Sequence, residues 1–279
     1  MLKSSFHWLE SLESRTFLSG HPLSYDEIGS GAVRGPAAPP IRLDLVFLHE
    51  LGHALGLGHS SDTKSIMYAY YNANYNIQNF ASDSSIPQFQ ALYANLTTSS
   101  WKDALDPAPG NGKVDITYSF MPDGTATDKG SSALFKYLDA DLGRTTWQSI
   151  MTSDLNLWAS LSNNKVAFVA HGDAGQPFGF SGLAQNDPSA GDIRIGAHRF
   201  DGAGKTLAHT YYPPPNGGTA AGDLHLDYAE NWVAASASST QINSTAPKGS
   251  SAAFESAGSL FSNAEISPAH KARDLLCAA

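Results

Sequence analysis

The chain has 279 residues, of which 42% are hydrophobic and 15% are charged, and these proportions fit one globular domain with flanking segments. Its 17 basic and 26 acidic residues give a formal net charge of −9, which argues against a nucleic acid as partner. No apolar run is long enough for insertion into a membrane, and the N-terminus lacks the apolar core of a signal peptide.

The first 40 residues are expected to form an N-terminal flanking segment. Glycine and proline are dense between residues 20 and 40, and this composition predicts irregular backbone. We therefore place the start of the first structured segment at residue 41.

Residues 49–59 carry the motif on which the functional interpretation depends, and they have the sequence HELGHALGLGH. On a helix, His49 and His53 share one face because they are four residues apart, and two imidazoles so placed can bind one zinc ion. The glycine after them lets the helix end, so that His59 can reach the same metal. Three protein ligands leave one coordination position open, as is typical of catalytic zinc, and Glu50 can then act as general base.

The pattern His-Glu-x-x-His-x-x-Gly-x-x-His resembles the signature of the metzincin zinc peptidases. Eight residues beyond His59, Met67 stands in Ser-Ile-Met-Tyr, which looks like the family's Met-turn, the tight turn beneath the zinc ligands. Residues 55–68 resemble the matrixin branch in particular, the family of the matrix metalloproteinases. The resemblance implies an α+β fold with a twisted mixed five-stranded sheet and three helices. It also implies a protein that is secreted or lies in the cell envelope.

The order of the segments differs from that of a matrixin, in which the sheet and a long helix precede the zinc helix. Here the segments that resemble this first half come after it: strands at 113–120, 166–170 and 192–196, an amphipathic helix at 145–160, and the stretch 207–232.

We therefore expect a circularly permuted catalytic domain with one half at 41–99, a linker at 100–112 and the other half at 113–232. The linker is rich in Ser, Asp, Pro and Gly, which suits an exposed segment. Joining the old termini and opening another loop can leave the core of a domain unchanged. The chain is then a monomer or a dimer, and a domain-swapped dimer, in which the halves pair between chains, is the alternative.

The loop from Tyr68 to Ser82 is expected to shape the pocket for the substrate residue after the cleaved bond. It carries the aromatic residues Tyr68, Tyr70, Tyr71, Tyr75 and Phe80. We expect a preference for a medium or large apolar residue at this position. The peptide would lie extended along an edge strand near residues 207–211.

The resemblance also implies a second, structural zinc that is held by three histidines and an aspartate. His198, His209 and His225 fall where those histidines would lie. The family's His-x-Asp pair is not intact, because two other residues separate His198 from Asp201, and the fourth ligand is therefore not identified. The alternative is that these are strand histidines without a metal.

Calcium is implied by the same resemblance, and oxygen atoms of carboxylates and loop carbonyls are the ligands that it prefers. The candidate ligands of a first site are Asp201, Gly202, Gly204, Asp227 and Glu230. A second site would use Asp192, the glycine-rich loop 216–218 and Asp223. The alternative for any one Asp-Gly pair is an ordinary turn.

Residues 233–279 are expected to form a C-terminal tail with a regulatory role. Cys277 is the only cysteine of the chain, so an internal disulfide is excluded. Matrixins are often kept latent by a pro-segment cysteine that occupies the open zinc position, and Cys277 is a candidate for such self-inhibition, with Asp26 as a substitute. The family's motif around that cysteine is absent here, and an idle thiol or an intermolecular disulfide are the alternatives.

The motif predicts a zinc endopeptidase that acts on peptide or protein substrates. Zinc would polarise the scissile carbonyl and activate a water, and Glu50 would take the proton of that water and pass it to the leaving amine. The alternative is a catalytically inactive metzincin-like binding protein. The intact Glu50 and the three zinc histidines favour the enzyme, because a binding protein does not need the base.

Overall fold

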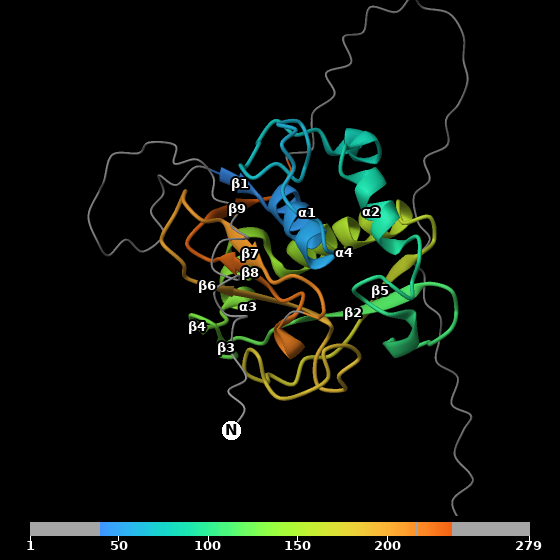
Figure 1. Ribbon diagram of the computed structural model, residues 1–279. Coiled ribbons are helices and arrows are strands. Elements are labelled where there is room, and N and C mark those ends of the chain that lie inside the picture. Colours follow the sequence, from blue (N-terminus) through green and yellow to red (C-terminus); the bar gives the residue numbers. More distant parts are fainter. Residues whose placement is uncertain (1–39, 216, 236–279) are drawn as a thin grey trace, which may run out of the picture. The chain divides into compact units, whose positions relative to one another are not determined.

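A mixed five-stranded sheet with the strand order β5-β2-β6-β8-β7 forms the centre of the described part of the chain (Figure 1). The computed structural model describes residues 40–215 and 217–235. The strands are β5 (Val166–Ala170), β2 (Val114–Phe120), β6 (Ile193–His198), β8 (Leu224–Asp227) and β7 (Ala208–Thr210). Within this sheet β7 is antiparallel to β8, and the other neighbouring pairs are parallel. The predicted mixed five-stranded sheet is therefore confirmed.

The central strand β6 is buried on both faces, and apolar residues alternate along it with Arg194, Gly196 and His198. Ile193, Ile195 and Ala197 point to one face, where they join the hydrophobic core. Arg194 and His198 point to the opposite face, where each meets an aspartate. One face of the sheet therefore carries the core, and the other carries buried polar groups.

The described residues contain four α-helices where the sequence predicted three: α1 (Leu43–Ala54), α2 (Ile86–Tyr93), α3 (Leu134–Leu142) and α4 (Arg144–Ser160). The helix predicted at 145–160 is present as α4. Gly143, with a φ of 77°, ends α3 directly before it. Glycine adopts a positive φ without steric cost, so a single helical region is divided into two.

All twelve residues of α1 are buried, including the polar residues Asp44, His49, Glu50 and His53. The indole of Trp158, from α4, donates a hydrogen bond to the carbonyl of Leu48 at 3.0 Å. The indole of Trp101 donates to the carbonyl of Ala54 at 2.9 Å. Helix α1 also contacts β7 and β8, and Figure 1 shows it in blue beside these orange strands. Segments from both halves of the sequence therefore pack around α1.

The segment 100–112, whose composition suggested an exposed linker, is exposed at residues 104–105 and 107–112 but buried at two residues. Trp101 is fully buried, and Asp106 is 1% exposed. The Asp106 carboxylate accepts hydrogen bonds from the backbone N–H groups of Ala108 and Asp115. Burial of a large aromatic side chain is favourable. Trp101 and the hydrogen bonds of Asp106 therefore anchor the first half of this segment on the fold.

The first and last strands of the described chain are neighbours. β1 (Pro40–Arg42) pairs in parallel with β9 (Asn231–Val233), and Ile41 lies opposite Trp232. The remaining short elements are the hairpin of β3 (Ala126–Thr127) and β4 (Gly130–Ser131), and the 3-10 helices η1 (Ile77–Ser82), η2 (Asp103–Leu105) and η3 (Gly218–Ala220). The pairing of β1 with β9 brings the two ends of the described fold together.

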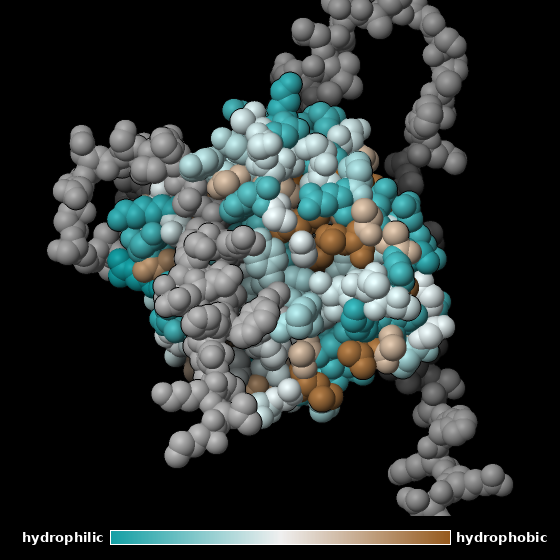
Figure 2. All heavy atoms as spheres, in the orientation of Figure 1, coloured by the Kyte–Doolittle hydropathy of each residue, from teal (hydrophilic) through white to brown (hydrophobic). Residues whose placement is uncertain are grey.

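The surface of the described residues shows no large apolar area. On the face drawn in Figure 2, hydrophobic residues form small groups among hydrophilic ones. The exposed large hydrophobic residues are Tyr70, Leu92, Leu105, Val169 and Leu183, which belong to separate segments. Among the helices that the structure describes, none is both long and apolar enough to span a membrane.

Candidate functional site

Three histidines converge at the end of α1. His49 and His53 lie on consecutive turns of the helix, and their Nε2 atoms are 3.0 Å apart. Beyond the helix, Gly56 has a φ of 100° and turns the chain back. The ring of His59 then lies 5.4 Å from that of His49 and 4.8 Å from that of His53. Each histidine can offer a nitrogen, and these nitrogens lie within 4.8 Å of one another.

Hydrogen bonds orient the two helical histidines. The Nδ1 atom of His49 lies 2.6 Å from the carbonyl oxygen of Ile66, and that of His53 lies 2.8 Å from the carbonyl oxygen of Leu57. A carbonyl only accepts, so Nδ1 carries the proton and Nε2 presents its lone pair to the cluster. Burial lowers the pKa of both rings, that of His53 to about 3, and thereby favours the neutral form that a metal requires. This donor set fits a zinc ion with three histidine ligands.

Met67, the residue of the predicted Met-turn, packs against Gly52 of α1. It is 1% exposed. A Cβ atom at Gly52 would lie only 2.3 Å from its Sδ atom, so any other residue at this position would force the Met67 side chain to shift.

Asp83 holds this turn in place, a role that no pattern in the sequence indicated. Its carboxylate accepts hydrogen bonds from the Ser65 hydroxyl at 2.7 Å, the Ile66 N–H at 2.6 Å and the Tyr75 hydroxyl at 2.7 Å. It also accepts from the N–H and hydroxyl of Ser85. Since Ile66 supplies the carbonyl that orients His49, Asp83 acts on the histidine cluster through the backbone.

Glu50 is fully buried beside the histidines. Its Oε2 atom accepts a hydrogen bond from the Thr210 hydroxyl at 2.7 Å, and its Oε1 atom has no hydrogen-bond partner among the described residues. Burial raises the pKa of Glu50 to about 8, against the opposing effect of the Thr210 hydrogen bond. A metal cation nearby would favour the carboxylate form.

A pocket opens next to His49. It is lined by Leu45, His49, Ser65, Ile66, Tyr68, Tyr70, Tyr71, Asn72 and Tyr75. The Tyr71 hydroxyl accepts a hydrogen bond from the Arg42 N–H at 3.0 Å, and the Tyr75 hydroxyl donates to Asp83. The four tyrosines belong to the loop that was expected to shape this pocket. Phe80 is fully buried in the core and does not line it.

A second cluster contains Asp128, His198, His209 and His225. The histidines come from the adjacent strands β6, β7 and β8, and His209 lies directly opposite His225. Asp128 comes from the turn between β3 and β4. Its Oδ1 atom lies 3.0 Å from Nε2 of His198 and 3.1 Å from Nδ1 of His225, and its Oδ2 atom lies 3.7 Å from Nε2 of His209. The three sequence-predicted histidines are therefore together, and Asp128 is the fourth polar group that was not identified.

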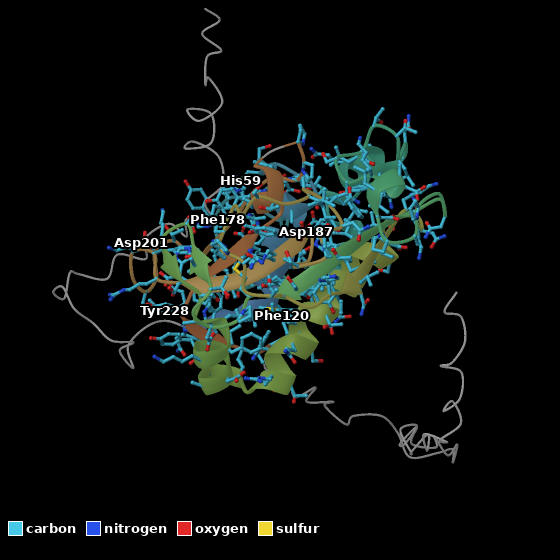
Figure 3. All side chains as sticks on the ribbon, turned by 90° about the horizontal axis from the view of Figure 1, so that it is seen from below. His59, Phe120, Phe178, Asp187, Asp201 and Tyr228 are labelled. Carbon is cyan, nitrogen blue, oxygen red and sulfur yellow. The ribbon has the colours of Figure 1, made fainter. Side chains whose placement is uncertain are left out.

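Asp128 could not be found from local sequence spacing. It lies 97 residues before His225 in the chain, within a short Asp-Lys-Gly turn. Burial alone would raise its pKa, but hydrogen bonds with His198 and His225 hold the pKa well below its usual value. The Tyr211 hydroxyl also donates to Asp128 at 3.1 Å. Phe178, labelled in Figure 3, packs beside His225 with 5.6 Å between ring centroids.

The loop that begins at Asp201 folds against Glu230. Gly202 and Gly204 have φ values of 93° and 77°, and the Gly204 N–H donates to both oxygens of Glu230 at 2.8 and 3.0 Å. The Oδ2 atom of Asp227 is buried and has no hydrogen-bond partner within the described chain. Burial raises the pKa of Asp227, and it raises that of Glu230 to about 8. The candidate ligands of the first calcium site therefore lie in one region, although both oxygens of Asp201 accept hydrogen bonds from Thr206. Like those of the second site, these carboxylates are not among the groups of the described residues whose ligand atoms all lie within 4.8 Å of one another.

The candidate ligands of the second calcium site do not form a carboxylate cluster in the described residues. The two oxygens of Asp192 accept hydrogen bonds from the backbone of Thr117 and Asn186. Asp223 is fully buried, and its Oδ1 atom accepts a hydrogen bond from the backbone N–H of Arg194 at 3.4 Å. Residue 216 of the expected loop lies outside the described residues.

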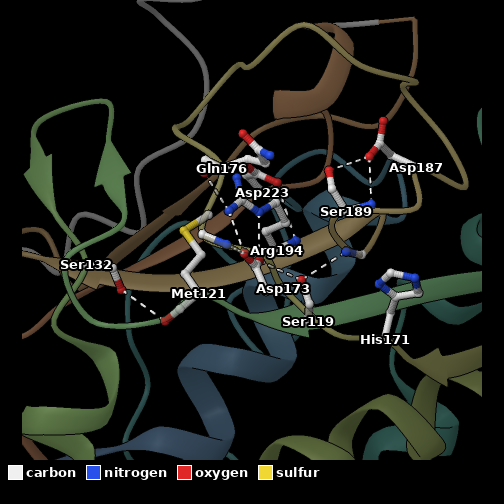
Figure 4. Close-up of polar contacts among 12 residues, drawn as sticks. Ser119, Met121, Ser132, His171, Asp173, Gln176, Asp187, Ser189, Arg194 and Asp223 are labelled. Carbon is white, nitrogen blue, oxygen red and sulfur yellow. Dashed lines mark hydrogen bonds and ion pairs between the residues drawn. The ribbon is translucent and has the colours of Figure 1, made fainter.

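Arg194 was not expected from the sequence to serve the site, and it supplies a buried positive charge in this region. Its guanidinium is bound to Asp173 through two contacts of 2.9 Å (Figure 4). Both side chains are almost completely buried. The arginine lowers the pKa of Asp223, which burial raises well above its usual value. The positive charge of Arg194 is therefore close enough to act on Asp223, one of the residues predicted to bind the second calcium.

Two further sequence-predicted residues, Cys277 and Asp26, lie outside the described residues.

Comparison with known proteins identifies the family. The model of the family Matrixin matches residues 18–94 and 132–247, more than half of the chain. Karilysin of Tannerella forsythia is 48% identical over 54 residues, which cover 16% of this chain and 11% of that protein. Human matrilysin is 47% identical over 55 residues, which cover 19% of this chain and 20% of that protein.

Metalloendoproteinase 1 of Glycine max is 50% identical over 42 residues, which cover 15% of this chain and 14% of that protein. The chain thus spans about a fifth or less of the length of these three curated relatives. No solved structure matches it. From the family match over both segments, we conclude that the chain belongs to the matrixin family.

Proposed function

We propose that this protein is a zinc-dependent endopeptidase with Glu50 as its general base. The observation that carries the proposal is the arrangement at the end of α1. Ring nitrogens of His49, His53 and His59 lie within 4.8 Å of one another. Glu50 is buried beside them, and its Oε1 atom has no hydrogen-bond partner in the described structure. His49, His53 and His59 would hold the metal. The chemistry that zinc supplies in such a site is polarisation of a peptide carbonyl and activation of water.

Glu50 performs the proton transfers in this proposal. Its free Oε1 atom accepts the proton of the attacking water, and the same carboxyl group then donates the proton to the leaving amine. The buried position removes competing solvent from the carboxylate. An inactive binding protein is the alternative function, and it would have no use for a buried acid with a free oxygen at this point.

The substrate in this proposal is a peptide or protein segment that lies extended along β7. This strand is the edge of the five-stranded sheet, and its last residue, Thr210, contacts Glu50. An edge strand can pair with an added strand through main-chain hydrogen bonds. The tyrosine-lined pocket beside His49 favours an apolar side chain after the cleaved bond.

Glu50→Gln should retain zinc and fold but lower kcat/KM for peptide cleavage by about a thousandfold, because the general base is removed at nearly constant shape. A peptide library is digested with and without a chelator, and cleavage sites are identified by mass spectrometry. Wild-type protein should lose activity on chelation and regain it with zinc. Equal cleavage by Glu50→Gln and the wild type would exclude this mechanism.

We also propose a structural zinc at Asp128, His198, His209 and His225. Four protein donors close the coordination sphere, which is typical of a structural rather than a catalytic zinc. Asp128 then supplies the ligand that the interrupted His-x-Asp pair lacks. One possible ligand atom from each of the four residues lies within 4.8 Å of the others.

Wild-type protein should contain two zinc ions per chain after dialysis, and Asp128→Ala should contain one and melt at a lower temperature. The reason is that loss of one of four ligands weakens a structural site while the histidines at α1 are unchanged. Elemental analysis gives the stoichiometry. Lys129→Ala, in the same turn, is the matched control and should keep two. A wild-type content of one zinc would refute the second site.

A calcium site in the loop 201–206 is our third proposal about metals. Gly202 and Gly204 shape the loop, and Asp201, Asp227 and Glu230 bring negative charge to it. The buried Oδ2 atom of Asp227, unpaired in the described residues, is the donor that a cation would satisfy. The second calcium is not part of this proposal, because both oxygens of Asp192 accept backbone hydrogen bonds and the charge of Arg194 acts on Asp223.

Calcium should stabilise the wild type by about 2.7 kcal/mol at a hundredfold excess over its dissociation constant. Asp227→Ala should abolish this increase, because the unpaired oxygen is lost. The melting temperature is measured in zinc-loaded protein with and without calcium. No change in protein that has been shown to be free of calcium would count against the site.

We propose that the domain is a circular permutation of the matrixin arrangement. The family match falls into two segments, and the pairing of Ile41 with Trp232 brings together the places where the chain would have been opened. Helix α1 contacts α4 and β7 of the same chain. In a permuted domain these contacts form within one chain, whereas in a swapped dimer they would form between two chains.

The protein should accordingly be active as a monomer of 29.6 kDa in light scattering coupled to size-exclusion chromatography. Because α1 packs against α4 and β7 of the same chain, the proposed active site needs no residue from a second chain. Specific activity should therefore stay constant on dilution. Activity that appears only at concentrations where a dimer forms would favour the domain-swapped alternative.

Three expectations remain predictions. They are the secreted or cell-envelope location, the boundaries of the flanking segments, and self-inhibition through Cys277 or Asp26. Replacing each of these two residues in turn and measuring activity before and after proteolytic trimming would test the last one.

A further inference from the structure

We propose that Thr210 is the positioning residue of Glu50, and this inference rests on the proposed function. The Thr210 hydroxyl donates to Oε2 of Glu50 at 2.7 Å across 160 residues of sequence. Thr210 is 1% exposed and Glu50 is fully buried. The other carboxylate oxygen, Oε1, has no partner in the described chain. One oxygen is therefore held, and the other is presented to the reaction.

The backbone of Thr210 is fixed on both sides by neighbouring residues. His209 lies opposite His225, and Thr210 lies opposite Leu224. The N–H of Tyr211 donates to the carbonyl of Asp223 at 2.9 Å. Strand β7 therefore cannot move away from α1 without breaking its pairing with β8.

Alternation along β7 explains how one strand serves two sites. Consecutive side chains of a strand point to opposite faces. His209 thus enters the cluster with Asp128, while Thr210 points to α1 and Glu50. Because threonine is branched at Cβ, few χ1 rotamers are open to it, and the hydroxyl is held in the direction of the carboxylate.

The physical consequence concerns the conformation of Glu50. A glutamate side chain has three rotatable bonds, and a single directed hydrogen bond selects one arrangement of the carboxylate. Without the hydroxyl, both oxygens would be buried without a partner, and the carboxylate would leave the position from which Oε1 reaches the attacking water. Thr210 does not line the pocket beside His49, and a peptide along β7 would pair with the main chain, which these substitutions keep, so KM should change little.

The test compares Thr210→Val and Thr210→Ala, which lack the hydroxyl, with Thr210→Ser, which keeps it. Valine preserves the branched shape required in β7, and alanine provides a second hydroxyl-free variant if valine impairs folding. Both should lower kcat by about ten- to a hundredfold with KM within twofold of the wild type. Thr210→Ser should restore most of kcat. Zinc content and melting temperature are measured for each variant.

Thr125→Val is the matched control. Thr125 is 5% exposed, and its hydroxyl has no hydrogen-bond partner in the part of the chain that the structure describes. The substitution makes the same chemical change in a buried threonine of another segment. It should leave kcat and KM unchanged, which separates the loss of this hydrogen bond from a general effect of replacing threonine.

Crystal structures of the variants supply a readout that is independent of activity. Glu50 should keep its side-chain conformation in Thr210→Ser and adopt a different one in Thr210→Val or Thr210→Ala. An unchanged Glu50 conformation without the hydroxyl would overturn the inference, as would a loss of kcat that serine does not rescue. Failure of the proposed function would appear differently, as absence of cleavage by the wild type or undiminished cleavage by Glu50→Gln.

Discussion

The complete burial of α1 is the constraint on which the rest of the structure depends. The helix carries His49, Glu50 and His53 into a region without solvent, where every polar group needs a partner or a metal. The partners come from outside the helix: the carbonyls of Ile66 and Leu57 bind the histidines, and Thr210 binds the glutamate. Burial thus lowers the pKa of both imidazoles. It also means that loops and strands with suitable hydrogen-bonding groups must surround the helix.

Strand β7 links the two polar clusters. Its three residues are buried, and successive side chains serve the Asp128 cluster and the general base. A metal at the second cluster would fix β7 relative to β6 and β8, and thereby fix the hydroxyl that holds Glu50. The proposed structural site and the proposed reaction would in this way be coupled through one short strand. The same strand forms the edge along which a substrate would bind.

The sequence predicted the elements that carry local signals. The spacing of His49, His53 and His59 depends only on helix geometry and a glycine turn, so the cluster could be predicted without knowledge of the fold. The strands at 113–120 and 166–170 and the helix at 145–160 also have their own periodicity, and β2, β5 and α4 confirm them. The residues that support the site have no such signal. Asp83 and Asp128 stand in polar turns, where an aspartate is common for purely local reasons.

The sequence by itself determined the chemistry of the centre, because three histidines and a glutamate at helical spacing can be brought together by one helix and one turn. The tertiary structure decided what completes and surrounds that centre. Asp128 and His225 are 97 residues apart in the sequence, and Thr210 and Glu50 are 160 apart. These contacts depend on how separate elements pack together, which no local pattern indicates. The tertiary structure also buried the Arg194–Asp173 ion pair near Asp223, one of the residues predicted to bind calcium. The physical reason is that local spacing fixes neighbours along one element, whereas contacts between elements depend on how the whole core packs.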